Sequence, residues 1–509
     1  MSFNWFISVD DHLIEPARLW QERLPERWRD TGPRIVRDGT AEFWVYEDRQ
    51  IVTTGLNAVA GKRREEFSPE PISYDDMRLG CYDPAARVAD MNQGHVLSSM
   101  LFPSFPRYCG QVFHEAKDRE LGLLCVRAWN DFILEELAGA YPGRFIPMMI
   151  IPLWDPVAAA DEVERTAARG AKSIAFSENP TKLGLPSIHT DHWDPLWQAC
   201  QDAGFVVSMH VGSSSNLIRT SDDMPTLAFM AYSAAANQAG TLLDWLFSGK
   251  FTQFPGLKIA LSEGSIGWIP YFLERAEQVI DKQRFWASRF DISMNAAHER
   301  GEQKSAATFD LDTDIRRLFA DHVYGTFIED QAGLRLLDII GEDNVMLECD
   351  YPHSDSTWPD TVQLAGKWLS HLPQETQDKI TVGNASRVYN FTPADPARLG
   401  GDEQARLSAV LGRCPELHAL AGHVTEFAKM LTGRRGDRLD SWLAAAGDHP
   451  ALAPFANGIR QDYQAVRNAL TLQWSSGRVE GLNTRTRLLQ RQMYGRAGFP
   501  LLRKRILAS

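Results

Sequence analysis

Eight short apolar runs alternate with segments of helical periodicity along most of this 509-residue chain, and the alternation predicts an α/β fold. Eight βα units favour a (β/α)8 TIM barrel over a doubly wound sheet, which usually carries a Gly-rich phosphate loop after its first strand. No G-x-G-x-x-G phrase follows the first run, which ends at Val9. The remainder of the chain is rich in Leu, Ala and Arg with helical periodicity, so we expect a mostly helical C-terminal appendage.

The predicted strands are the runs at residues 6–9, 96–102, 145–150, 171–176, 205–210, 257–262, 323–328 and 345–349. Helices are predicted between them, and several open with Asp or Pro, as helix N-termini often do. The clearest helical segments are residues 118–140, 156–169, 194–203, 268–282 and 330–340. Two insertions, Ala17 to Ala89 and Phe285 to Thr313, are far longer than ordinary βα loops, and such insertions usually act as lids, binding loops or contacts.

The first predicted strand runs into an Asp-x-His pair, Asp10 and His12. Side chains alternate along a strand, so these two share one face and can reach one ion. A carboxylate and an imidazole together suit Zn²⁺, Mn²⁺ or Fe²⁺ better than Ca²⁺. The alternative is that Asp10 caps the following helix and His12 is an ordinary loop histidine.

Two further candidate ligands end later strands. His210 ends the fifth predicted strand, and Asp350 directly follows the eighth. The C-terminal ends of barrel strands converge on one rim, where the catalytic residues of such barrels lie. The sequence therefore predicts a mixed oxygen and nitrogen metal site on that rim.

Composition and charge place few limits on function. Hydrophobic residues make up 44% and charged residues 23% of the chain, as in ordinary soluble proteins. The N-terminus shows no signal-peptide pattern and no apolar stretch is long enough to span a membrane, so we expect a cytoplasmic protein with no membrane partner. The six cysteines lack C-x-x-C spacing, which argues against a disulfide framework or a structural zinc knuckle.

The net charge of −13 conceals a split between two segments. From Gly401 onward there are 16 Lys and Arg against 9 Asp and Glu, a balance of +7, and the other 37 basic and 57 acidic residues leave −20 for the rest. A Pro- and Gly-rich stretch separates the two segments. We therefore predict a barrel domain over residues 1–392, a linker over 393–403 and a second domain over 404–509.

The first domain resembles the amidohydrolase superfamily, in the branch that includes aminocarboxymuconate-semialdehyde decarboxylase and the resorcylate decarboxylases. The resemblance rests on five phrases: Asp10-x-His12 with Glu15-Pro16, Trp193-Asp194-Pro195-Leu196-Trp197, Gly267-Trp268-Ile269-Pro270-Tyr271, Asp350-Tyr351-Pro352-His353, and Gly383-Asn384-Ala385. It implies one divalent metal ion per barrel, Zn²⁺ first and Mn²⁺ as the alternative, held by Asp10, His12, His210 and Asp350.

The chain departs from that family at the end of the sixth strand. Many members have a His-Gly-Gly phrase there whose His is the proton donor, whereas this chain has Glu263 followed by Gly264. Glu263 is therefore a candidate general acid or base, with an orienting hydrogen bond to a ligand as the alternative. His353 is a second candidate proton carrier, or else a structural loop histidine. Arg275 is a candidate partner for a substrate carboxylate, or else a solvated helix arginine.

The C-terminal segment of about 105 residues resembles the end of DDE-type insertion-sequence transposases. In the resemblance, Glu480 takes the place of the third carboxylate of a two-metal site, and the other two carboxylates belong to a core that this chain lacks. One carboxylate cannot hold two Mg²⁺ ions, so we expect no transposition. A fragment of this size cannot easily bury a core of its own, so we expect its apolar helix faces to dock on the barrel, to pair with another tail or to remain loosely ordered.

We interpret the chain as a metal-dependent carbon–carbon lyase, a decarboxylase in which Asp350 is both ligand and catalytic residue. Its substrate would be a small carboxylated aromatic or enolic molecule. A metal-hydroxide hydrolase of an amide, lactone or ester is the first alternative, because a bound ion supports either chemistry. The second alternative is a DNA-binding protein that acts through the Arg-rich tail, although we expect no nucleic acid partner. We also expect a homo-oligomer, a dimer.

Overall fold

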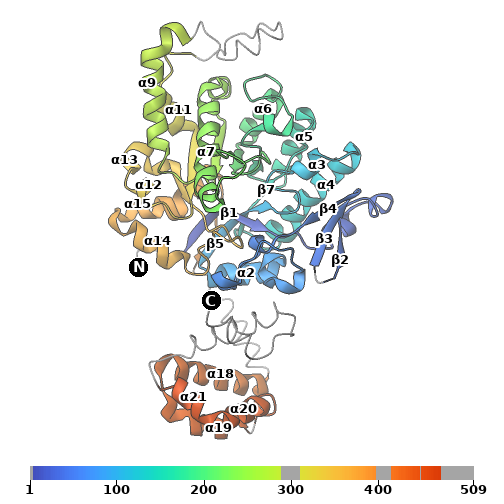
Figure 1. The fold of residues 1–509 in the computed structure, drawn as a ribbon, viewed down its shortest axis with the longest axis vertical. Coiled ribbons are helices and arrows are strands. Elements are labelled where there is room, and N and C mark those ends of the chain that lie inside the picture. The colour runs from blue at the N-terminus through green and yellow to red at the C-terminus, as the bar shows by residue number, and fades with distance from the viewer. Residues whose placement is uncertain (1–3, 40, 288–309, 397–413, 448, 472–509) are drawn as a thin grey trace. The chain divides into compact units, whose positions relative to one another are not determined.

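In the computed structural model, which describes residues 4–39, 41–287, 310–396, 414–447 and 449–471, parallel strands form a barrel enclosed by helices (Figure 1). One sheet has the order β1-β5-β6 and a second has the order β12-β11-β10-β9-β8-β7. These strands are β1 (Phe6–Leu13), β5 (Val96–Pro103), β6 (Phe145–Ile146), β7 (Met148–Met149), β8 (Ser173–Ala175), β9 (Val206–His210), β10 (Lys258–Ser262), β11 (Val323–Phe327) and β12 (Val345–Leu347). Within the described residues, all eight predicted strand positions are confirmed.

Two seams join the sheets into the barrel. At one seam the amide of Asp350 donates to the carbonyl of Asp10 at 2.9 Å, and the amide of His12 donates to the carbonyl of Tyr351 at 2.7 Å. At the other, Pro147 separates β6 from β7 because proline has no N–H to donate to a strand ladder. The first seam brings the ends of the first and last strands together, where candidate ligands lie on both.

Helices follow the strands and cover the barrel. The longer ones are α2 (Pro84–Gln93), α4 (Arg119–Phe132), α5 (Pro156–Ala167), α6 (Asp194–Ala203), α7 (Thr226–Phe247), α9 (Ile269–Ala287), α11 (Ile315–His322) and α14 (Thr361–Trp368). The short ones are α1 (Leu19–Arg23), α3 (Gln111–His114), α8 (Lys250–Gln253), α12 (Gln331–Leu334), α13 (Leu337–Ile340), α15 (Gln374–Asp378) and α16 (Asn384–Val388).

Most helix predictions hold, with two differences. The helix expected over residues 118–140 continues beyond α4 as a π-helix over Ile133–Gly139. The single helix expected over residues 330–340 is instead two short helices, α12 and α13. They are separated at Leu336, whose φ and ψ of −114° and 19° are not helical.

The first insertion contains an antiparallel sheet that was not predicted. Its strands are β2 (Arg34–Asp38), β3 (Ala41–Tyr46) and β4 (Arg49–Val52), in the order β2-β3-β4. Trp44 and Tyr46 of β3 are buried in the main hydrophobic core, so this insertion is packed onto the barrel. Most of the second insertion, residues 288–309, lies outside the described residues.

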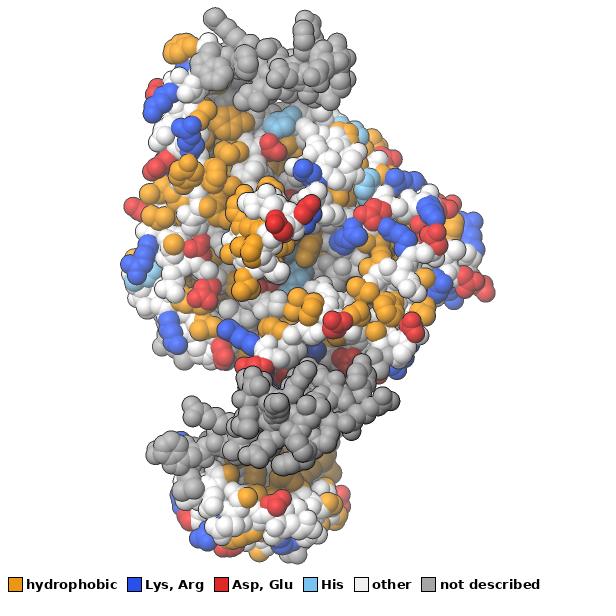
Figure 2. Space-filling view, in the orientation of Figure 1, with side chains coloured by type: hydrophobic (Ala, Val, Ile, Leu, Met, Phe, Trp, Pro, Cys, Tyr) orange, Lys and Arg blue, Asp and Glu red, His pale blue; other side chains and the backbone are white. Residues whose placement is uncertain are grey.

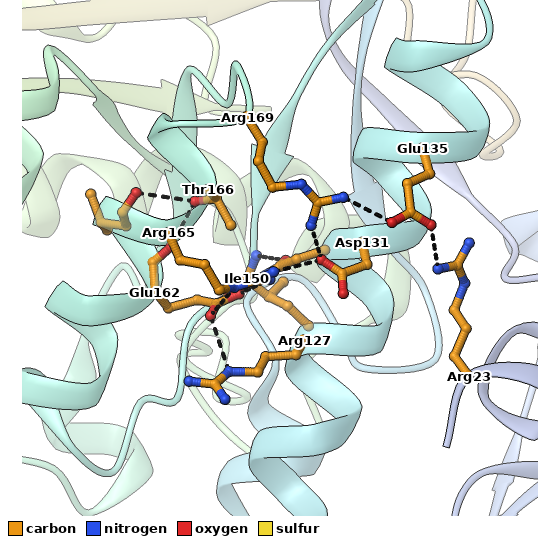
Figure 3. A network of polar contacts seen from close by, with 11 residues as sticks. Arg23, Arg127, Asp131, Glu135, Ile150, Glu162, Arg165, Thr166 and Arg169 are labelled. Carbon is orange, nitrogen blue, oxygen red and sulfur yellow. Dashed lines mark hydrogen bonds and ion pairs between the residues drawn. The ribbon is translucent and has the colours of Figure 1, made fainter. Parts of the chain in front are cut away.

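A polar network ties α4 and α5 together on the outside of the barrel (Figure 3). Its centre is Glu162, a fully buried carboxylate that accepts hydrogen bonds from Asn130 at 2.7 Å and from Arg165 at 2.6 and 2.8 Å. Arg165 also donates to Asp131 at 2.7 Å. Buried charges that are paired and fully hydrogen-bonded, as here, fix the register of the elements that carry them.

The chain divides into two compact units, Met1–Leu399 and Gly400–Ser509. In the second, the described helices are α18 (Pro415–Gly433), α19 (Leu439–Gly447), α20 (Ala453–Gln461) and α21 (Tyr463–Ala469). They enclose a hydrophobic cluster of Met430, Leu439, Trp442, Leu443, Ala446, Ala456, Ile459 and Leu470. The expectation that this tail buries no core of its own is therefore wrong, because four helices bury their apolar faces on one another without a sheet.

Two parts of the prediction for the linker and the tail fall on residues that the structure does not describe. Glu480 and most of the predicted linker, residues 393–403, lie outside the described residues, so the domain boundaries remain a prediction. Among the residues that the structure describes, no helix is both long and apolar enough to cross a membrane.

Candidate metal centre

The four predicted ligands all lie at the C-terminal ends of barrel strands. Asp10 and His12 lie on β1, His210 is the last residue of β9, and Asp350 lies three residues after β12. Each is at most 1% exposed. Because β1 extends to Leu13, the strand alternation turns Asp10 and His12 to one side, and Asp11 between them bonds Ser99 of β5 instead.

Short distances join these side chains around one point. The Nε2 atoms of His12 and His210 lie 3.2 Å apart, and each lies 3.5 Å from a carboxylate oxygen of Asp10. The Nε2 atom of His12 is also 3.2 Å from Oδ1 of Asp350. Candidate ligand atoms of Asp10, His12 and His210 all lie within 4.8 Å of one another, as do those of His12, Asp350 and His353. The structure thus brings together all four predicted ligands.

The cluster contains acceptors that lack donors. His210 Nδ1 lies 2.6 Å from the carbonyl oxygen of Val211, which can only accept, so the ring proton is on Nδ1 and the Nε2 lone pair faces the cluster. Among the described residues, the carboxylate oxygens of Asp10 and Asp350 accept no hydrogen bond of regular geometry. The polar atoms nearest to Oδ1 of Asp350 are the ring nitrogens of His12 and His353, each at 3.2 Å. Buried acceptors of this kind are costly unless something satisfies them, and a divalent cation would satisfy them all at once. The donor set fits such an ion.

Burial and neighbouring charges shift the pKa values of the four proposed ligands. Burial, followed by the nearby charges of Glu348 and Glu263, raises the pKa of Asp10 well above its ordinary value. Burial lowers the pKa of His210 to about 4, which keeps this imidazole neutral, as a metal ligand must be. Burial alone would raise the pKa of Asp350, but the adjacent His353 and His12 outweigh it and lower that pKa.

The predicted proton carriers border the cluster and are more accessible than the ligands. Oε2 of Glu263 lies 3.2 Å from Nε2 of His210, and its side chain is 22% exposed. His353 stacks on His12 with ring centroids 3.5 Å apart, and its Nδ1 lies 3.2 Å from Oδ1 of Asp350. Burial and the charges of Asp350 and Glu348 raise the pKa of Glu263 well above its ordinary value. A substrate entering from solvent would therefore meet Glu263 and His353 before the ligands.

Backbone strain marks two of these positions. Glu263 has a φ of 56° and Asp350 a φ of 58°, in the left-handed region that non-glycine residues rarely occupy. Such strained residues persist only where the surrounding structure enforces them, and they concentrate at functional sites.

Arg275 is not brought to this cluster. It lies on the exposed face of α9, beside a surface depression of about 310 Å³ that it lines with Tyr271, Glu274 and Gln278. These residues are spaced three, four and seven apart, which places them on one helix face. The structure supplies no contact between Arg275 and the cluster, and its role in substrate binding remains a prediction.

Three residues that the sequence reasoning missed also border the site. Glu348 accepts a hydrogen bond from Thr326 and one from the Glu263 amide at 3.3 Å, and burial raises its pKa to about 8. It precedes Asp350 by two residues, so the strand alternation could have identified it. Tyr108 stacks on His210 with centroids 4.1 Å apart, and Glu178 accepts from the Gly212 amide at 2.9 Å. Glu178 follows the fourth predicted strand by two residues, so the convergence of strand ends on one rim could have identified it. No local sequence signal identifies Tyr108.

Comparison with known proteins agrees with this architecture. A family model described as "Amidohydrolase" matches residues 28–391, and one described as "Transposase" matches residues 392–506. A gamma-resorcylate decarboxylase from Rhodococcus jostii is 26% identical over 289 residues, which cover 54% of this chain and 78% of the relative. A second, from Polaromonas sp., is 24% identical over 276 residues, covering 52% of this chain and 76% of the relative.

Solved structures share the fold. An amidohydrolase from Mycobacterium avium subsp. paratuberculosis superposes with a TM-score of 0.56 at 21% identity, covering 76% of this chain and 100% of that one. A 5-carboxyvanillate decarboxylase from Novosphingobium aromaticivorans, complexed with manganese and 4-hydroxy-3-methoxy-5-nitrobenzoic acid, superposes with a TM-score of 0.51 at 17% identity. This match covers 77% of this chain and 97% of that one. The family match spans more than half of the chain, and the chain therefore belongs to the amidohydrolase family.

Proposed function

We propose that the chain is a metal-dependent decarboxylase of a small aromatic or enolic carboxylic acid, with Asp10, His12, His210 and Asp350 as the metal ligands. The observation that carries the proposal is the buried cluster of acceptors without donors at the strand ends. The resorcylate decarboxylases among its relatives support the choice of reaction. The fold alone does not indicate which reaction is catalysed, because barrels of this kind host many different chemistries.

The ion is proposed to be Zn²⁺ or Mn²⁺. Two imidazole nitrogens and two carboxylates suit either of them. Glu263 adds a third carboxylate at the edge of the cluster, 3.2 Å from a ligand nitrogen, and oxygen-rich sites favour Mn²⁺ over Zn²⁺. The carboxyvanillate decarboxylase with bound manganese adds a reason to test Mn²⁺ first.

The bound ion would supply Lewis acidity that stabilises negative charge developing on a substrate oxygen. When the bond to the carboxylate breaks, CO₂ leaves and the electron pair stays on the substrate carbon, which then needs a proton. Glu263 is proposed to deliver that proton from its carboxyl oxygen, since its raised pKa favours the protonated form. His353 is the alternative donor, through the Nε2 atom that has no partner among the described residues.

The test uses the full-length protein, loaded with Mn²⁺ or treated with a chelator. A panel of hydroxylated benzoic acids and enolic acids is assayed for CO₂ release, and a parallel panel of esters, lactones and amides for hydrolysis. CO₂ release that requires the ion supports the decarboxylase. Metal-dependent hydrolysis without CO₂ release would instead establish the alternative reaction, and the proposal would be wrong.

We also propose a homo-oligomer, a dimer. Figure 2 shows hydrophobic side chains at the surface over α7, where Leu227, Met230 and Tyr232 are 85%, 62% and 41% exposed. Apolar patches of this kind often mark interfaces. Light scattering of the purified protein gives the mass of the assembly, and a monomer at micromolar concentration would contradict this prediction.

Cytoplasmic localisation and the absence of a nucleic acid partner remain predictions. DNA binding that weakens with salt would contradict the second of these.

A further inference from the structure

A buried arginine outside the barrel strands contacts two segments that carry proposed metal ligands, one at His12 and one at Tyr351. Arg87 lies on α2, at the end of the first insertion, and is 1% exposed. Its Nε atom donates to the carbonyl of Gly80 at 2.7 Å, and its Nη2 atom donates to the carbonyl of His12. The guanidinium carbon lies 4.3 Å from the centroid of the Tyr351 ring. Arg87 therefore contacts one proposed ligand and the residue that follows another.

Helix α2 makes a second contact with Tyr351, at the seam between β1 and β12. The hydroxyl of Tyr351 donates to Oδ2 of Asp90 at 2.6 Å, one helical turn after Arg87. Asp90 is held in turn by two hydrogen bonds of 2.7 Å from Arg78. There is no spare room here, because a Cβ at Gly80 would lie 2.0 Å from Oδ2 of Asp90. The Tyr351 ring is thus fixed through its face by Arg87 and through its hydroxyl by Asp90.

The placement of Arg87 is costly for a purely structural residue. Removing a guanidinium from water is unfavourable unless it is hydrogen-bonded and its charge is compensated. Among the described residues, its hydrogen-bond acceptors are carbonyls, its Nη1 atom has no partner, and the nearby carboxylate of Asp11 interacts with it through charge alone. An apolar side chain would fill the same space without this cost. The arginine gains its two directional contacts with His12 and Tyr351.

We infer that Arg87 is a positioning residue for the metal site: it fixes the His12 main chain against Tyr351, and so sets the separation of the ligands His12 and Asp350. The inference rests on the proposed metal centre. Partners that orient metal ligands typically change metal affinity by about 10–100-fold when they are removed. We expect a loss of that size when Arg87 is replaced by a side chain that cannot reach both contacts.

The test measures the Kd of the full-length protein for Mn²⁺ by calorimetric titration, with circular dichroism to confirm folding. Arg87→Gln should weaken Mn²⁺ binding about 10–100-fold, and Arg87→Lys should recover part of the loss because one amine reaches a single acceptor. The matched control is Arg144→Gln. Arg144 is also buried and donates to two carbonyls, those of Leu97 and Val96 at 2.8 and 3.0 Å, but at the start of β5, away from the ligands.

The control should lose stability and keep its affinity for Mn²⁺. Folded Arg87→Gln protein with wild-type affinity would overturn the inference, and so would equal affinity losses in the two glutamine variants. If Arg87→Gln does not fold, Arg87→Lys and Tyr351→Phe decide the matter: both must fold and bind Mn²⁺ more weakly than the wild type. A wild-type protein that binds no Mn²⁺ or Zn²⁺ would overturn the proposed function itself, and the inference with it.

Discussion

Replacing His210 by alanine removes one proposed ligand and leaves the rest of the cluster in place. The imidazole is fully buried, its Nε2 atom lies 3.2 Å from that of His12, and its ring stacks on Tyr108 at 4.1 Å. Partners that only orient ligands are worth about 10–100-fold in metal affinity, so loss of a ligand itself should cost at least about 100-fold. Decarboxylation should fall with metal occupancy.

The same substitution has a packing cost that must be separated from the loss of the ligand. Aromatic stacking is worth about 0.5–1.5 kcal/mol beyond the area buried, so the metal-free variant should lose about 1–3 kcal/mol of stability and still fold. His322→Ala is the control, because His322 is also buried, bonds a carbonyl through Nδ1 at 2.7 Å and stacks on Phe251 at 4.5 Å. It lies at the opposite ends of the strands and should keep its metal.

Calorimetric titration with Mn²⁺ and thermal unfolding followed by circular dichroism measure the two effects. We expect His210→Ala to lose metal affinity and His322→Ala to retain it, at comparable losses of stability. Full metal affinity in the His210 variant would refute the assignment of this residue as a ligand.

Three further predictions address the proton donor, the pH dependence and the tail. Glu263→Gln keeps the shape of the side chain but removes its proton, so turnover should fall by about 10²–10⁴-fold while the protein still binds metal; an unchanged rate in a steady-state assay would leave proton delivery to another group. Between pH 6.5 and 8 the metal-free protein should lose stability as pH rises, and Glu348 should contribute at most about 1.4 kcal/mol per pH unit to that loss, because the folded state keeps the proton of Glu348, with a pKa raised to about 8, after the unfolded state has released it. Below pH 6.5 the lowered pKa of His210 acts in the opposite direction, so the slope is measured above that pH by urea unfolding, and an equally steep slope in Glu348→Gln would contradict the assignment. Truncation after Gly401 should leave metal content and turnover unchanged, because the barrel strands and the proposed ligands all precede it; a truncated protein that is folded by circular dichroism but inactive would show that the tail takes part in catalysis.

The barrel was predictable because its strands are buried on both faces. Such strands appear as continuous apolar runs, and each predicted run contains a strand. The sheet of the first insertion was missed because it is only partly buried: β2 has the residues Arg34–Asp38, with no side chain fully buried. Its pairing with β3 depends on packing against the barrel, which no local pattern in the insertion reports.

The ligand positions were predictable for a similar reason. Strand alternation places Asp10 with His12, and the strand ends place His210 and Asp350 on the same rim. Contacts made from outside the barrel strands were not predictable. Tyr108 reaches His210 from the loop after β5, and Arg87 reaches His12 from a helix 75 residues away in sequence. Their roles depend on how the loop after β5 and helix α2 pack against the strand ends, which only the folded chain defines.

The most direct test of the account is pulsed electron paramagnetic resonance of Mn²⁺ bound to the full-length protein. This measurement detects nitrogen nuclei coordinated to the ion and counts them. We expect one Mn²⁺ per chain, coupled to two imidazole nitrogens, from His12 and His210, in the wild type and to only one in His210→Ala. A bound ion without nitrogen coupling, or coupling that survives unchanged in His210→Ala, would contradict it.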